Sequence, residues 1–138
     1  MIAMLEERQR LLVDMARDAI RTRYSAGRHH VGCALVTRSG RIYTGVHLEC
    51  TIGRITVCAE AVAIGAAATA GDAASIAAIV AVRQQGPDDP EPRIVSPCGM
   101  CREMIADYAP DAEIIVPGPD GARIASVQTL LPERYSRS

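Results

Sequence analysis

The sequence predicts an α/β fold, a three-layer α-β-α sandwich with a mixed sheet of roughly five strands. Apolar residues alternate along the chain between helical spacing and short β-branched runs. The elements that they predict follow the order helix, strand, strand, helix, strand, helix, strand, strand, helix, which favours a mixed sheet between helical layers. The length of 138 residues fits one domain, and we expect residues 1–138 to form it.

A helix and a strand hairpin are predicted at the start of the chain. From Met4 to Tyr24, apolar residues recur at helical spacing with charged residues between them, which is typical of an amphipathic helix on a sheet face. Residues 31–37 and 41–46 are apolar runs, and residues 38–40 form a short connection between them that contains glycine. Such a connection predicts an antiparallel hairpin.

The middle of the chain predicts an alanine-rich helix and one strand. Thr56 is a suitable N-cap for a helix to about Ala70, and Gly71 is suited to end it. Because small residues occupy nearly every side of this helix, we expect it to be buried on more than one face. Residues 76–82 are a β-branched run typical of a strand, and the polar, proline-rich residues 84–92 predict a surface loop.

The last third supplies the remaining elements. Ser96-Pro97 precedes a helix predicted from Cys98 to about Tyr108, because proline is tolerated near a first helical turn. Residues 113–116 and 123–125 are predicted as short strands. Ser126 is the expected cap of a final helix through Leu131.

Charge and hydropathy narrow the class of partner. The net charge is -1, with 15 basic residues, all arginine, against 16 acidic ones, so no basic field is available to bind nucleic acid or an anionic membrane. The longest apolar run, residues 61–82, is mostly alanine and is broken by Gly71-Asp72, so it is not a membrane span. The first residues are charged and lack an apolar signal core, which predicts a cytoplasmic protein. A small, roughly neutral molecule is the expected partner.

Three cysteines and one glutamate carry the predicted chemistry. Cys58 stands two residues before Glu60, and Cys98 and Cys101 form a C-x-x-C pair. An odd count of five cysteines without a secretory signal favours metal binding over disulfides. Thiolates suit zinc, and three protein ligands leave a tetrahedral zinc one position open for water. We therefore predict one zinc per chain, with Glu60 moving protons for the bound water.

A structural zinc site is the alternative to a catalytic one. Cys33 or Cys50 would then supply a fourth thiolate, and the chain would be a zinc-stabilised structural or binding module. The position of Glu60 beside a ligand favours the open site. In that interpretation Cys33 is a buried strand residue, and Cys50 has an equally ordinary role.

These motifs resemble those of the zinc-dependent cytidine deaminase superfamily. Residues 58–60 are similar to its C-A-E element and residues 97–101 to its P-C-x-x-C element. Residues 44–49 resemble the family's substrate loop, and residues 31–35 resemble its first strand. The resemblance implies a cytidine deaminase-like fold and a homotetramer, with a role in pyrimidine salvage. It also implies hydrolytic deamination in which Glu60 serves in turn as base and acid.

The resemblance also assigns the substrate contacts. Glu49 matches the family's acceptor for ribose hydroxyls, but His47 stands where the family has asparagine. Neutral imidazole offers one donor and one acceptor, as a sugar hydroxyl pair requires. His29 stands at the position of a stacking phenylalanine, although an exposed loop position is as well supported for it. Because the chain contains no Phe or Trp, stacking falls to histidine or to tyrosine, for which Tyr135 is the candidate.

Charge balance at the metal is a further expectation. Three thiolates on Zn²⁺ leave a formal charge of about -1, and members of the family often place an arginine directly after C-A-E. That position is Ala61 here, so Arg54 or Arg102 is the candidate substitute.

The predicted reaction is zinc-dependent hydrolysis of cytidine or deoxycytidine to uridine or deoxyuridine and ammonia. An antibiotic-type enzyme resembling blasticidin-S deaminase is the alternative, because that branch shares Gly-Val beside the substrate loop, an apolar residue after C-A-E and Leu-Leu-Pro near the end. The changes at His29 and His47 predict a preference for another amino-heterocycle or a modified sugar over cytidine.

Overall fold

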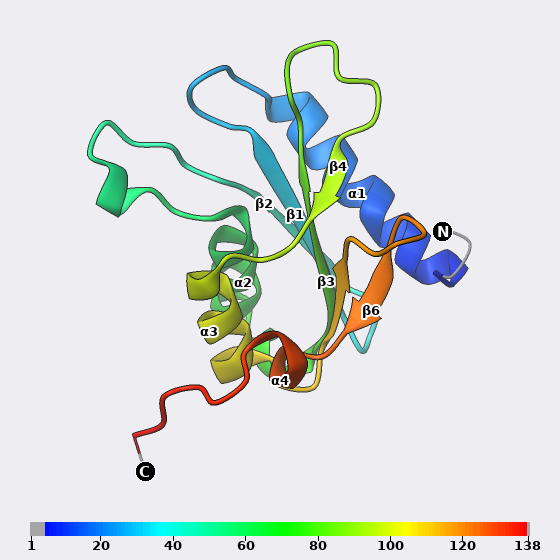
Figure 1. Cartoon of the computed structure of the whole chain (residues 1–138), viewed down its shortest axis with the longest axis vertical. Helices are drawn as coiled ribbons and strands as arrows, with labels where there is room; N and C mark the ends of the chain where they lie inside the picture. Colours follow the sequence, from blue (N-terminus) through cyan, green and yellow to red (C-terminus); the bar gives the residue numbers. More distant parts are fainter. Residues whose placement is uncertain (1–4, 138) are drawn as a thin grey trace.

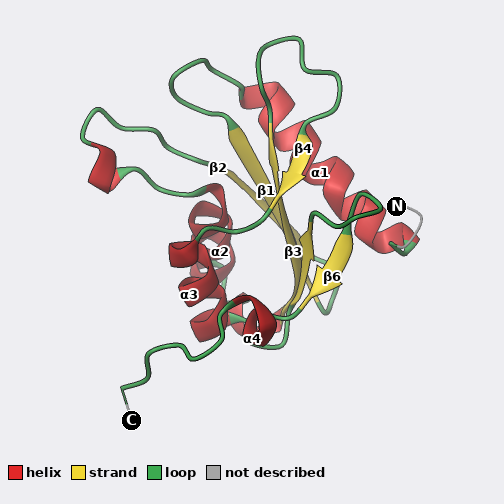
Figure 2. Cartoon of the chain, in the orientation of Figure 1, coloured by secondary structure: helices red, strands yellow, loops and turns green. Residues whose placement is uncertain are grey.

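The computed structural model describes residues 5–137, in which a six-stranded sheet lies between two helical layers (Figures 1 and 2). The elements are α1 (Glu7–Arg23), β1 (Val31–Thr37), β2 (Ile42–Val46), α2 (Ala59–Thr69), β3 (Ile76–Arg83), β4 (Arg93–Val95), α3 (Gly99–Tyr108), β5 (Glu113–Val116), β6 (Arg123–Ala125) and α4 (Val127–Leu130), with 3-10 turns at Gly53–Ile55 and Ala73–Ser75. The predicted α/β sandwich is confirmed. The predicted start of the first helix at Met4 lies outside the described residues.

The sheet is mixed, as predicted. Its strand order is β2-β1-β3-β5-β6, and β4 pairs with β3 beside this path. Strand β1 is antiparallel to both β2 and β3, whereas β3 and β5 are parallel. Strand β4 is an addition to the five predicted strands. The three residues of β4 pair with Ala81–Arg83 at the end of β3. Three residues are too few to show the alternating pattern by which a strand is predicted from sequence.

Helices cover opposite faces of the sheet, with α1 on one face and α2 and α3 on the other (Figure 2). Alternate residues of β1 therefore enter different cores. Cys33 and Leu35 belong to the core beneath α2 and α3, whereas Ala34 belongs to the core beneath α1. No helix within residues 5–137 is long and apolar enough to cross a membrane.

Two glycines let these helices rest directly on strand backbone. A Cβ atom at Gly45 of β2 would lie 2.7 Å from the Ala63 nitrogen and 2.9 Å from the Ala59 oxygen of α2. A Cβ atom at Gly32 of β1 would lie 2.7 Å from the Ala16 oxygen of α1. Only glycine permits such an approach. The first turn of α2 is thus held at a fixed depth against β2.

Helix α2 begins later than predicted. Its N-cap is Cys58, and the expected cap, Thr56, is wrong. The Thr56 hydroxyl instead accepts a hydrogen bond of 3.2 Å from the Cys50 backbone nitrogen. Helix α3 has Cys98 as its N-cap, so two of the predicted ligands occupy equivalent positions at two helix starts.

Candidate active site

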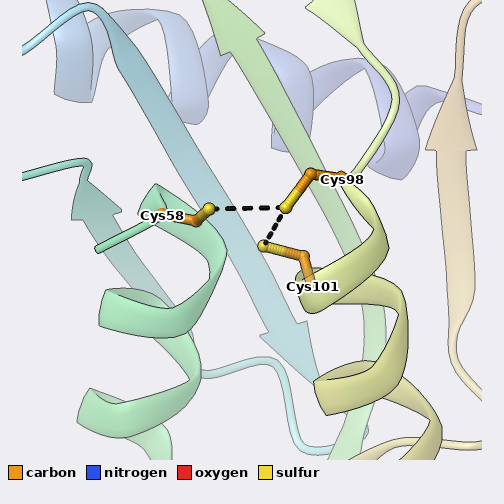
Figure 3. A group of neighbouring side chains, drawn as sticks. All are labelled: Cys58, Cys98 and Cys101. Carbon is orange, nitrogen blue, oxygen red and sulfur yellow. Dashed lines mark hydrogen bonds between the residues drawn. The ribbon is translucent and has the colours of Figure 1, made fainter. Parts of the chain in front are cut away.

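Three thiols meet where α2 and α3 begin (Figure 3). The sulfur atoms of Cys58 and Cys98 are 3.5 Å apart, and those of Cys98 and Cys101 are 3.6 Å apart. All three sulfur atoms lie within 4.8 Å of one another. A tetrahedral zinc with bonds of about 2.3 Å to sulfur sets its sulfur ligands about 3.8 Å apart. The spacing of the three thiols therefore fits one zinc without movement of either helix.

The protonation behaviour of these thiols also fits a cation site. Desolvation by burial raises the pKa of Cys58 to about 11 and raises the pKa of Cys101 far above its ordinary value. At Cys98 the desolvation is outweighed by hydrogen bonds from the Cys101 and Met100 backbone and from the neighbouring thiols, so its pKa is lowered. Three clustered thiolates require a positive charge among them, and binding a metal supplies it.

Arg102 and Arg54 were the two candidates to balance the thiolate charge. Arg102 donates from Nε to the Pro97 carbonyl at 2.9 Å and from Nη1 to the Leu130 carbonyl at 2.7 Å. It therefore ties the segment before Cys98 to the end of α4. Arg54 lies exposed in the 3-10 turn before α2. The positive ends of α2 and α3 are the nearest source of favourable potential for the thiolates.

Glu60 lies in the first turn of α2 with only 6% of its surface exposed. Desolvation raises the pKa of its carboxyl group, and an interaction with the Cys101 thiol partly opposes this rise. A cavity of about 10 Å³ beside Glu60 is lined by Ala81, Pro97 and Ile105 among others, which is about the space of one water. A carboxyl group that contacts the cluster without belonging to it is suited to carry protons.

The two remaining cysteines lie apart from this group. Cys33 is fully buried in β1, and its pKa is raised first by burial and then by the nearby Glu60 charge. The Cys50 thiol lies 3.8 Å from the carbonyl oxygens of Leu48 and Ile55. Within residues 5–137, the metal-binding group contains neither of them. The geometry therefore offers an open site with three ligands.

The predicted substrate residues His47 and Glu49 lie on the segment that pairs with the residues before α2. Leu48 pairs with Val57 through two backbone hydrogen bonds of 2.9 and 3.0 Å, which places His47 and Glu49 next to the start of α2. His47 is buried, with 7% of its surface exposed, and Glu49 is exposed.

The two predicted stacking residues, His29 and Tyr135, lie in different parts of the molecule. The His29 ring is 6.3 Å from the His47 ring between centroids and nearly perpendicular to it, so His29 lies beside one of the other predicted substrate residues. Tyr135 is 78% exposed on a C-terminal segment that leaves α4 at the opposite end of the molecule from residues 24–30 (Figure 1). The C-terminal segment that carries Tyr135 thus lies away from the loop that carries His29 within one described chain.

His30 was not identified as a site residue from the sequence. Its ring centroid is 5.1 Å from that of His47, and its backbone nitrogen contacts the His47 ring. The only sequence signal was the His-His pair itself, which is equally typical of an exposed loop.

The chain matches the model of the cytidine and deoxycytidylate deaminase zinc-binding region over residues 6–116, which include the three thiols and Glu60. It belongs to this family. The deaminase assignment makes the protein a zinc-dependent hydrolase that acts on cytidine-like substrates, as its motifs predicted.

Individual relatives agree with this deaminase assignment. Blasticidin-S deaminase of Bacillus cereus is 44% identical over 129 residues, which are 92% of this chain and 91% of that protein. A probable cytidine deaminase of Dictyostelium discoideum is 29% identical over 136 residues, 97% of this chain and 88% of that one. The crystal structure of cytidine deaminase from Burkholderia pseudomallei is similar with a TM-score of 0.75 and 28% identity, covering 95% of this chain and 100% of that one.

Proposed function

We propose that this deaminase hydrolyses the exocyclic amine of a cytosine nucleoside, with Cys58, Cys98 and Cys101 holding zinc and Glu60 moving protons. One observation carries the proposal. Three sulfur atoms within 4.8 Å of one another stand at two helix starts, and the buried Glu60 carboxyl group lies beside them without joining the donor set. A fully liganded structural site would leave no position for a reacting water.

The residues divide the reaction between them. Zinc held by the three thiols would supply a water activated for attack. Glu60 accepts a proton from the attacking water and donates it to the ring nitrogen beside the carbon that bears the amine. A second proton transfer through Glu60 lets the amine leave as ammonia, and the ring carbon keeps the water oxygen. The burial of Glu60 limits proton exchange with bulk water during these transfers.

Glu60→Gln tests this assignment. The amide keeps the size of the side chain but cannot shuttle a proton, so kcat should fall by roughly 10² to 10⁴. Zinc content should stay at one per chain, because the three thiols are untouched. Glu49→Gln is the matched control, with its main effect expected on KM. A near-normal kcat in Glu60→Gln would refute the mechanism.

Two substrates fit the proposal. Cytidine or deoxycytidine fits the family, whereas blasticidin S fits the 44% identical Bacillus cereus deaminase and the histidines at positions 29 and 47. We propose that this chain prefers a cytosine nucleoside with a modified sugar, of which blasticidin S is the candidate. Ammonia release from cytidine, deoxycytidine and blasticidin S should then give the highest kcat/KM for blasticidin S. Equal or better turnover of cytidine would leave plain cytidine deamination.

We also propose that the chain assembles as a homotetramer. Four large apolar side chains near the active site have 42% to 59% of their surface exposed, namely Leu48, Ile52, Ile55 and Met100. The outer side of α2 presents only small residues such as Gly65 and Ala66. Association with further copies would remove these surfaces from water. Light scattering at micromolar concentration should give four times the chain mass, and a monomer would contradict the proposal.

The single catalytic domain, the cytoplasmic location and the role in pyrimidine salvage remain predictions.

A further inference from the structure

One ring nitrogen of His47 is fully used by the backbone. Nδ1 accepts a hydrogen bond of 2.9 Å from the backbone nitrogen of Val31. The His30 nitrogen lies 2.8 Å from Nδ1 and 3.3 Å from Nε2, so it stands over the ring and not along the Nδ1 lone pair. A ring nitrogen whose lone pair accepts an N–H bond carries no proton. The neutral His47 ring therefore has its proton on Nε2.

The other nitrogen of the His47 ring faces a carboxylate. Nε2 lies 3.8 Å from Oε1 of Glu49, which is too long for a direct hydrogen bond. An oxygen atom placed between the two can accept from Nε2–H and donate its own proton to Glu49. A hydroxyl group does both, as a water does, whereas an ether oxygen has no proton and an ammonium group has no acceptor.

His47 also joins two segments that are distant in the sequence. Its backbone nitrogen donates to the Val31 carbonyl at 3.1 Å, and Nδ1 of His29 lies 2.8 Å from the His47 carbonyl, to which it donates. The Glu49 nitrogen donates to the Arg28 carbonyl at 3.1 Å. Residues 28–31 are thus held beside the end of β2, and the bond from the Val31 nitrogen depends on the His47 ring.

The surroundings of the His47 ring keep it neutral. The ionisable groups that face it are His29, His30 and Glu49. Burial, followed by the charge of His30, lowers the pKa of His47, and a backbone contact with Val31 and the Glu49 charge oppose them only in part. Protonation of Nδ1 would also place a hydrogen against the Val31 N–H group, which disfavours the charged ring.

We propose that His47 is a positioning residue with two separable tasks. Its Nδ1 fixes residues 28–31 against β2 through Val31, and the same bond fixes the proton on Nε2, which becomes the single donor that the ring offers to a substrate hydroxyl shared with Glu49. The ring does not supply the donor and acceptor pair expected from the sequence. The substrate half of this inference rests on the proposed function, whereas the loop and tautomer half does not.

Two variants separate the two tasks of His47. In His47→Asn, the amide oxygen can take the place of Nδ1, but the side chain is too short to place a donor at Nε2. In His47→Gln, the amide can place a donor near Nε2, but no acceptor remains at Nδ1. The asparagine variant should keep slow amide exchange at residue 31 while KM rises roughly three- to tenfold with little change in kcat. The glutamine variant should instead show faster amide exchange at residue 31. Equal behaviour of both variants would overturn the two-task assignment.

Nitrogen NMR of the zinc-loaded protein tests the tautomer without any substrate. The sequence contains only three histidines, so His29→Gln and His30→Gln suffice to assign the signals. His47 should appear as the Nε2–H form. His30 should appear as the Nδ1–H form, because its Nε2 accepts a bond of 2.9 Å from the Gly27 nitrogen. A His47 signal of the Nδ1–H form, or one averaged between forms, would overturn the inference. The expected tautomers without deaminase activity on any nucleoside would instead refute the proposed function alone.

Discussion

Replacing Gly45 by alanine should weaken the metal centre through helix α2. The new Cβ would lie 2.7 Å from the Ala63 nitrogen, whereas ordinary Cβ contacts begin at 3.4 Å, so α2 must move by about 0.7 Å. The contacts are with backbone, which cannot turn aside, and overpacking of this kind costs about 1 to 3 kcal/mol. Because Cys58 and Glu60 stand at the start of the displaced helix, zinc affinity and kcat should fall too. A misplacement near 1 Å costs about 10² in rate, so we expect a loss of roughly ten- to a hundredfold.

Gly32→Ala is the matched control for this displacement. Its Cβ would meet the Ala16 oxygen at 2.7 Å and the Ile20 Cβ at 2.9 Å, so the clash is equally severe but moves α1 on the other face. Both variants should unfold at lower temperature at one fixed protein concentration. Only Gly45→Ala should release zinc more readily to a competing chromogenic chelator. Equal zinc retention in both variants would refute the argument that α2 is seated by its contact with β2.

Three further results are expected. Cys98→Ser should lose zinc by elemental analysis while Cys50→Ser keeps one per chain, since only the first belongs to the thiol group; zinc loss from both would point to a closed site. Arg93→Glu should raise the unfolding midpoint, because Arg93 stands directly opposite Arg83 and an opposite charge there is worth about 0.2 to 1 kcal/mol; a lower midpoint would contradict this. Burial lowers the pKa of His47 below its ordinary 6.5, so the unfolded chain binds a proton before the folded chain does as the pH falls. The stability present above about pH 6.5 should therefore be lost as the pH falls towards the lower pKa of the folded chain. Thermal scans of wild type and His47→Asn should show a shallower acid slope in the variant, and identical slopes would exclude this contribution.

The sequence alone determined the element types and the residues of the metal centre. C-A-E and C-x-x-C are local spacings, and each places its side chains through a single helix turn, so no knowledge of distant contacts is needed to interpret them. Helical and β-branched runs are local in the same way. The predicted α/β sandwich, zinc and deaminase family were confirmed on these grounds.

Tertiary structure decided the features that depend on pairing between distant segments. The strand order and the addition of β4 follow from hydrogen bonds that leave no local pattern. Arg102 was a candidate partner for a thiolate, but its hydrogen bonds hold the carbonyl groups of Pro97 and Leu130. His47 was expected to offer a donor and an acceptor, yet the Val31 N–H group occupies its acceptor nitrogen. The sequence specifies which side chain stands at a position, but which of its donors and acceptors stay free depends on the partners that the fold brings to it.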